Sequence, residues 1–567
     1  MSTHKYTTAS SVQSSASSQH MSFAPDILRP AVRFSATLKE PLLFREAMSA
    51  LYAVVTTDQR YTPPDKTEYK KWRVEQDAKE LAEIIKELEI QSDLHTQKNV
   101  CIDKLNTLFQ DSGLLAIIEK EREKRQVEEY LAFMEYKRNN WWKFVDPIIT
   151  VHPDEVFFEG MSIDESMYGK VSVHHSALEA KGDIQCGTTN VDFSKKLYDE
   201  FQKIRSSKET RLEIDPQGFT VQVEHSDAHR EKKIDVPKTW IRGFTEVVAG
   251  MALQRYQFRL HPQDILSVCS FLKRHREITG PRSIRWKLQQ GQPITVVMEP
   301  WGTEIRFHRS IYTGTESVEI RTWGRRRLHV LERLVPIANH FDIVLLGTGL
   351  PFYCSASISP TPTFGAEPLM TFTLGLSGWT ANSFSAGSNL HSMLNTEEVD
   401  PTIMQQVYDC LRNQFSYKAT IDDIANTLHL SKETVRSSLL TYAQVGSVIF
   451  DLHHQCFRVR ELFRSPPSIK DLEKRTDIEM FADQLIEQGC IQHMFPLYRE
   501  YTSVVAIQND PLQKDKINSL ITIDPDGVLI FKGCTCTCHY FRTNSMNKGP
   551  CSHMIATYRY AQIKEVL

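Results

Sequence analysis

The stretch Cys536-Thr-Cys538 is followed, after twelve residues, by Cys551-Ser-His553 near the end of the chain. Three thiols and one imidazole therefore fall within eighteen residues. Zn²⁺ binds four nitrogen or sulfur ligands in a tetrahedron, and two such pairs joined by a short loop supply them. The spacing predicts one zinc site with Cys536, Cys538, Cys551 and His553 as ligands. Because protein fills all four positions, we interpret the zinc as structural.

The exact ligand set has alternatives. Cys534-Thr-Cys536-Thr-Cys538 offers two overlapping Cys-x-Cys pairs, and His539 is a further nitrogen ligand. A core packed with free cysteines would also bury these side chains, because free Cys is commonly buried. Packing alone does not require alternate spacing that ends in a histidine, so we favour the metal site.

A strand and a helix are predicted on either side of the pairs. Val528–Phe531 is a short apolar run that follows the turn signal Asp524–Gly527. Met554–Leu567 contains no Gly or Pro, and it can form a helix. The expected order is strand, Cys-x-Cys, loop, Cys-x-His, helix.

This order resembles the SWIM zinc finger, whose pattern is Cys-x-Cys, a variable loop and Cys-x-His. Phe541 and the wording of Gly549–Ala556 also fit that family. The resemblance favours Cys536 and Cys538 as the first pair, with Cys534 as a spare thiol or a donor to a ligand. We predict a SWIM-type module over residues 478–567. Phrases in the centre of the chain also look like segments of large bacterial SWIM-containing proteins.

Composition indicates a multidomain protein of ordinary globular character. The chain has 567 residues, of which 41% are hydrophobic, and a formal net charge of −3. No apolar window approaches a membrane span, and we expect no membrane partner. The eleven cysteines are scattered apart from the terminal cluster, which favours a reducing compartment. We expect a cytoplasmic protein.

The fold class is predicted to be multidomain α+β. Residues 1–30 are rich in Ser, Thr and Gln and are expected to form a disordered tail. Residues 31–146 carry charged stretches with apolar residues at three and four spacing, which predicts a helical region. An intramolecular bundle is favoured there over a coiled coil, because no heptad run persists. Residues 147–395 mix strand and helix signals, with strands expected at 219–224 and 294–299 and a helix at 262–275, which predicts an α+β central domain.

The densest basic patch is Arg325-Arg326-Arg327, at the end of an extended segment that begins at Val318. Three guanidinium groups could grip a phosphate or an acidic partner. Glu319 and Glu332 lie close in sequence, so local ion pairing is the favoured alternative.

Residues 400–465 predict a winged helix-turn-helix. Thr420 and Ser431 each precede apolar residues at three and four spacing, so they are expected to cap the second and third helices. Val448–Phe450 is expected to pair with Cys456–Val459 as the wing.

In such a fold the third helix enters the major groove of DNA, which makes Lys432 and Arg436 the predicted nucleic-acid contacts. Further basic side chains on or beside the wing are His453, His454, Arg458 and Arg460. Winged helices also dock proteins, and a fold does not fix a function. DNA and a protein partner therefore both stay open.

The sequence offers no recognisable catalytic set, so we predict a non-enzymatic adaptor that uses Zn²⁺, the SWIM finger and the winged helix to bind DNA or a protein. The resemblance implies a link to MoxR-type AAA+ ATPases and von Willebrand A-domain (VWA) proteins. The alternative is a nucleic-acid-processing enzyme whose active site lies in residues 147–395.

Overall fold

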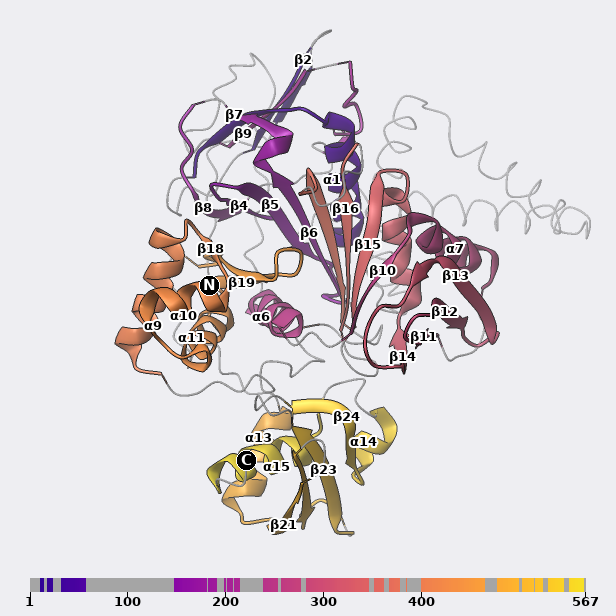
Figure 1. Cartoon of the computed structure of the whole chain (residues 1–567), viewed down its shortest axis with the longest axis vertical. Coiled ribbons are helices and arrows are strands. Elements are labelled where there is room, and N and C mark those ends of the chain that lie inside the picture. Colours follow the sequence, from indigo (N-terminus) through magenta and orange to yellow (C-terminus); the bar gives the residue numbers. More distant parts are fainter. Residues whose placement is uncertain are drawn as a thin grey trace, which may run out of the picture. The chain divides into compact units, whose positions relative to one another are not determined.

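The computed structural model combines helices and strands, in agreement with the predicted α+β class (Figure 1). By its contacts the chain divides into two units, residues 1–59 with 144–567, and residues 60–143. The described residues all belong to the first unit. They are 11–14, 18–23, 32–57, 147–180, 182–190, 198–199, 201–207, 209–214, 238–252, 256–276, 282–345, 351–360, 367–377, 384, 399–463, 477–498, 502–513, 515–523, 529–544 and 550–564. Within them, no helix is both long and apolar enough to cross a membrane.

An antiparallel sheet of eight strands forms the centre of this unit. In spatial order the strands are β10 (Tyr256–Leu260), β15 (Ala338–Leu345), β16 (Phe352–Ile358), β17 (Met370–Leu376), β6 (Met167–His174), β5 (Glu155–Met161), β4 (Ile148–Val151) and β8 (Gly187–Asn190). Strands β5, β16 and β17 are buried at every position. Since successive side chains of a strand point to opposite faces, both faces of the sheet are covered.

Two helices provide that cover, α1 (Pro41–Val55) and α6 (Lys238–Ala252). Val171 of β6 shares a core with Leu51 of α1. Tyr168 of the same strand packs edge-on against Phe244 of α6, with ring centroids 6.0 Å apart. Residues 168 and 171 have opposite parity along the strand, so the two helices lie on opposite faces.

Helix α1 approaches the sheet so closely that two strand positions need glycine. A Cβ atom at Gly160 would lie 2.5 Å from Val55 Cγ1, and one at Gly169 would lie 2.9 Å from Leu51 Cδ1. Either contact is too short for two carbon atoms. The missing side chains therefore fix how near the helix lies.

Residues 32–57 belong to the same core as the central sheet, which corrects the predicted boundary between 31–146 and 147–395. Helix α1 confirms helical structure at Pro41–Val55, but strand β3 (Phe34–Leu38) precedes it. The rest of the predicted helical region, residues 58–146, lies outside the described residues.

The predicted disordered tail, residues 1–30, is wrong where the structure describes it. Strands β1 (Ser11–Ser14) and β2 (Ser18–Phe23) join a five-stranded sheet in the order β1-β2-β9-β3-β7. The other strands are β9 (Glu209–Ile214) and β7 (Leu178–Ala180). A polar segment forms strands here because β2 pairs with β9, a partner almost two hundred residues away.

A smaller sheet in the order β13-β12-β11-β14 follows helix α7 (Pro262–Arg274). Its strands are β11 (Ser283–Leu288), β12 (Pro293–Met298), β13 (Thr303–Ile311) and β14 (Val318–Trp323). The predicted helix at 262–275 and strand at 294–299 are confirmed to within a residue. The strand predicted at 219–224 lies outside the described residues.

Residues 401–463 follow the predicted order of elements. Helix α9 (Pro401–Asp409) continues as a π-helical turn (Cys410–Gln414), and the other elements are β18 (Lys418–Ala419), α10 (Ile421–Leu428), α11 (Lys432–Gln444), β19 (Val448–Asp451) and β20 (Cys456–Val459). Thr420 and Ser431 cap α10 and α11 through their side-chain oxygens, as predicted. Strands β19 and β20 pair as a hairpin.

Two arginines that follow this hairpin's turn are buried against the central sheet. The Arg458 guanidinium donates from Nη1 and Nη2 to the Asp154 carboxylate, 2.9 Å each, and from Nε to Asp451 Oδ2, 2.7 Å. Arg460 Nη1 donates to Glu159 Oε1, 3.1 Å. Both arginine side chains are 0% exposed. The hairpin is thus tied to β5 and to the turn before it.

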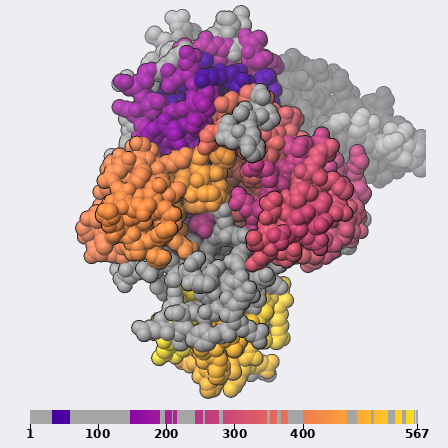
Figure 2. All heavy atoms as spheres, viewed as in Figure 1, coloured from indigo at the N-terminus to yellow at the C-terminus, as the bar shows by residue number. Residues whose placement is uncertain are grey.

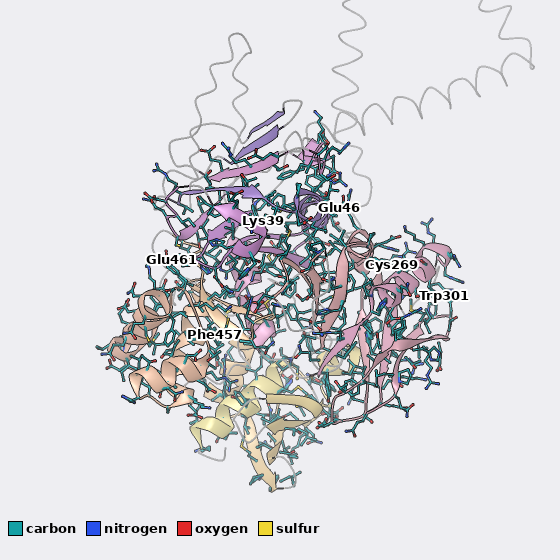
Figure 3. The ribbon with its side chains drawn as sticks, turned by 45° about the horizontal axis from the view of Figure 1, so that its top comes forward. Lys39, Glu46, Cys269, Trp301, Phe457 and Glu461 are labelled. Carbon is teal, nitrogen blue, oxygen red and sulfur yellow. The ribbon has the colours of Figure 1, made fainter. Side chains whose placement is uncertain are left out.

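Main-chain contacts complete this anchor. Burial lowers the pKa of His152 to about 3, so its ring is neutral, and its Nε2 lies 2.7 Å from the carbonyl oxygen of Val459. The Glu461 N–H donates to Thr188 Oγ1 of β8, 3.2 Å. Figure 2 shows the 401–463 segment (orange) against residues 148–190 (purple), and Figure 3 labels Phe457 and Glu461 in this segment.

We predict that Arg458→Met lowers the free energy of unfolding by about 3–5 kcal/mol, because it leaves buried carboxylates without their cationic partner. Arg259→Met is the matched control. Arg259 also pairs with an aspartate, Asp342 at 2.8 Å, but its side chain is 64% exposed, so about 0–1 kcal/mol is expected. Urea unfolding of the full chain, read by hydrogen exchange of residues 448–459, measures both. Equal losses would contradict the anchor.

Candidate metal centre

The C-terminal segment builds a four-stranded antiparallel sheet in the order β21-β22-β23-β24. Its elements are α13 (Asp477–Glu487), β21 (Ile491–Tyr498), β22 (Thr502–Gln508), β23 (Ile517–Ile523), β24 (Leu529–Cys536), α14 (His539–Asn544) and α15 (Ser552–Ile563). Cys536 ends β24, and Cys538 precedes α14 directly. Cys551 precedes α15, and His553 lies in its first turn. The predicted strand before Cys-x-Cys and the predicted helix after Cys-x-His are confirmed, but helix α14 lies between the two pairs where a loop was predicted.

The structure brings the four predicted ligands together. One ligand atom from each of Cys536, Cys538, Cys551 and His553 lies within 4.8 Å of the others. All four side chains are buried, the most exposed at 5%. The donor set of three sulfurs and one imidazole suits a metal that accepts tetrahedral S and N ligands. This cluster could hold a metal ion.

The two alternative ligands do not join the cluster. Cys534 is buried in β24, and its Sγ accepts a hydrogen bond from the Thr522 N–H of the neighbouring strand, 3.3 Å. His539 is exposed at the start of α14. Between the two overlapping Cys-x-Cys pairs, the geometry selects the second.

The thiols strongly influence one another's ionisation. Hydrogen bonds from the Cys536 and Cys551 thiols lower the pKa of Cys538, while the Cys538 contact raises the pKa of Cys536 to about 12. Burial and the same contacts raise the pKa of Cys551 well above its usual range. Three thiolates so close together repel one another, and a divalent cation would offset that repulsion.

A carboxylate behind the histidine was missed by sequence reasoning. Asp510 Oδ2 lies 3.1 Å from His553 Nε2, and the Asp510 side chain is 1% exposed. Bonded in this way, Nε2 carries the proton and leaves Nδ1 as the nitrogen able to bind a metal. Metal-binding histidines commonly hold their second nitrogen against a carboxylate. Asp510 follows β22, far from the Cys/His motif in sequence, so spacing gave no signal.

A buried glutamine fixes the helix that carries His553. The Gln508 side-chain nitrogen lies 2.7 Å from the His553 carbonyl oxygen, 2.7 Å from Thr557 Oγ1 and 2.9 Å from Ser519 Oγ. Gln508 is 0% exposed and lies at the end of β22. The sheet thereby sets the position of α15, and with it the position of the imidazole.

The predicted nucleic-acid contacts lie on α11 but do not form a basic surface. Lys432 Nζ is 2.8 Å from Asp422 Oδ1, in a pair whose side chains are 64% and 60% exposed. Arg436 is half-buried one turn further along. The wing arginines, Arg458 and Arg460, are buried in the ion pairs described above, so their predicted exposure to DNA is wrong.

The basic patch at Arg325–Arg327 also does not form an open phosphate-binding site. The three arginines begin a 3₁₀ helix (Arg325–Leu334), and Arg325 and Arg327 are buried. Arg325 lies over the ring of Trp301, labelled in Figure 3, at 5.0 Å from its centroid. Arg327 Nη1 donates to the Ser166 carbonyl oxygen, 2.6 Å. The partners of Arg325 and Arg327 are thus an aromatic ring and a carbonyl oxygen rather than the acids expected, since Glu319 pairs with Arg285 and Glu332 with Lys273.

No protein-family model matches the chain, and no curated protein matches it. Among solved structures, the proliferating cellular nuclear antigen from Entamoeba histolytica has 9% identity and a TM-score of 0.27, covering 41% of this chain and 89% of that one. The PCNA2–PCNA3 complex from Sulfolobus tokodaii has 8% identity and the same TM-score, covering 41% and 90%. Likeness at this level carries no argument about fold or function.

We predict that Cys551→Ser lowers the metal content of the purified chain by about one ion relative to the parent, because a Cys3His site loses a thiolate. Cys534→Ser is the matched control, since this buried cysteine lies outside the cluster and should keep full occupancy. Elemental analysis of both variants measures this. Full occupancy in Cys551→Ser, or loss only in Cys534→Ser, would overturn the ligand assignment.

We predict that Asp510→Asn weakens metal affinity about 10–100-fold, because the imidazole loses the carboxylate that orients it. A chelator competition titration measures the affinity. Asp515→Asn, a change at an exposed aspartate in the following loop, should leave it unchanged. Equal affinities of the two variants would mean that the Asp510 contact does not support the metal.

Proposed function

We propose that the chain is a zinc-stabilised binding protein in which the C-terminal module is a SWIM-type finger with a structural zinc ion. The supporting observation is the Cys536, Cys538, Cys551 and His553 cluster, in which four protein ligands leave no position for a substrate. The binding free energy of such a site is largely folding free energy. Zinc would therefore hold α15 against the sheet and keep the binding surface formed.

We propose further that residues 400–465 are a winged helix-turn-helix that binds a protein rather than DNA. The order of helices and strands and the two helix caps support the fold. The charges of the segment favour a protein over DNA as the ligand. Residues 401–463 contain six Lys or Arg and six Asp or Glu, so the segment has no net charge. Two of the six cations, Arg458 and Arg460, are buried. DNA binding draws on several exposed cations that contact phosphates, and this segment offers few.

The family resemblance supplies the class of protein partner. By that resemblance, we propose a MoxR-type AAA+ ATPase or a VWA protein as the partner. Two central carboxylates, Asp154 and Glu159, pair with buried arginines and so give the enzyme alternative no support.

A salt-titrated binding assay separates the two ligand classes. We expect any affinity of the zinc-loaded chain for duplex DNA to fall with salt at a log–log slope no steeper than about −2, because only Lys432 and Arg436 of α11 can meet phosphates. Replacing both with Ala should flatten the slope. Replacing Arg306 and Arg309, two exposed cations of β13, is the charge-matched control and should not.

A slope of about −4 or steeper would make DNA the ligand and overturn the protein-docking proposal. The complementary experiment is sedimentation of the chain with a purified MoxR-type ATPase and a VWA protein from the same genome. Co-sedimentation that is lost after chelation supports the zinc-dependent adaptor. No complex with either protein, with zinc bound, removes these partners from the proposal.

A further inference from the structure

Two histidines and one glutamate converge at the turn of the β19–β20 hairpin. His453 and His454 lie in that turn, and Glu367 lies just before β17 of the central sheet. Glu367 Oε2 is 3.5 Å from His453 Nε2 and 3.2 Å from His454 Nε2. One ligand atom from each residue lies within 4.8 Å of the other two.

These separations fit one metal ion. Zinc–nitrogen and zinc–oxygen bonds of about 2.0–2.1 Å place tetrahedral ligand atoms about 3.3–3.4 Å apart. The two nitrogen–oxygen distances to Glu367, 3.2 and 3.5 Å, lie on either side of that value. Imidazole with carboxylate is a donor set that Zn²⁺, Co²⁺ and Ni²⁺ accept.

The buried Asp451 fixes the positions of both histidines through hydrogen bonds. Its Oδ1 accepts the backbone N–H groups of His453, 3.0 Å, and His454, 3.3 Å, which fixes the turn. Its Oδ2 lies 3.0 Å from His454 Nδ1. An ionised carboxylate can only accept hydrogen bonds, so His454 Nδ1 donates its proton to Asp451. In a neutral ring the other nitrogen, Nε2, then carries a lone pair that faces Glu367. Two lone pairs at 3.2 Å repel unless a proton or a metal cation lies between them.

The charges nearby place that cation on the Glu367 side of His454. Behind the ring, Asp451 and Glu155 are already met by Arg458 and Lys170. On the other side, Glu367 has 56% of its side chain exposed, which gives a metal ion a path from solvent. Lys418 of β18 pairs with Asp154 at 3.5 Å.

We propose that His453, His454 and Glu367 form a second metal site, for a divalent transition metal of the zinc, cobalt and nickel class. Three protein ligands leave at least one coordination position for water or a partner's side chain. The ligands come from the hairpin turn and from the central sheet, so the ion fastens the tip of the hairpin to the sheet. This site is independent of the C-terminal cluster and of the function proposed for it.

Cobalt distinguishes the two sites, because only the C-terminal cluster contains thiolates. The untagged full chain, stripped with a chelator under reducing conditions, is titrated with Co²⁺ while the near-ultraviolet and visible spectra are recorded. We expect two ions per chain. One gives a thiolate-to-cobalt charge-transfer band, and the other gives only visible bands of nitrogen and oxygen ligation.

Glu367→Gln with His454→Gln should bind one ion, keep the charge-transfer band and weaken the second binding event at least about tenfold. His308→Gln, which removes an exposed histidine of β13, should still bind two. Hydrogen exchange of residues 448–459 should slow in the parent protein when the second ion binds. One ion in the parent, two ions in the double variant, or unchanged exchange would each overturn the second site. Loss of the charge-transfer band alone would instead overturn the C-terminal centre.

Discussion

The pairing of Arg458 and Arg460 with the carboxylates of the central sheet is the constraint on which the rest of the described structure depends. A guanidinium with no exposed surface is tolerated only when acids meet its charge. Asp154, Asp451 and Glu159 meet it, and two of them belong to a different part of the sequence from the hairpin. The 401–463 segment is therefore not an independent module on a linker, because separating it would break these buried ion pairs.

This anchor changes how the charge of the segment is understood. From the sequence alone, Arg458 and Arg460 are basic residues of the wing that could contact DNA phosphates, and a wing with two arginines is typical of a DNA-binding domain. In the structure, their charge is already used, and Lys432 of α11 lies beside Asp422, an acid of the same segment. A surface without excess positive charge gains little from counterion release. We therefore propose protein docking, rather than DNA binding, for this fold.

Local sequence patterns correctly predicted the features that depend on residues close together in the sequence. The caps at Thr420 and Ser431 and the four Cys/His ligands are set by spacings of a few residues, and all of them are found where expected. Contacts between distant segments were invisible. Asp510 approaches His553 only after β22 and α15 have packed, and β2 becomes a strand only beside β9. Polar composition in the first thirty residues predicted disorder, since no single-sequence rule encodes a partner strand.

The same distinction separates the two candidate metal centres. The C-terminal cluster is made by a short stretch of chain, so its ligands can gather wherever that stretch closes its loop, and a bound ion contributes directly to folding the module. The histidine and glutamate site exists only when the hairpin has docked on the central sheet, because Glu367 comes from beside β17 and its partners from the turn. Metal bound at this site would therefore indicate that the hairpin is docked on the central sheet. The buried arginines hold the base of the hairpin, and the ion would hold its tip, so both depend on one arrangement of the chain.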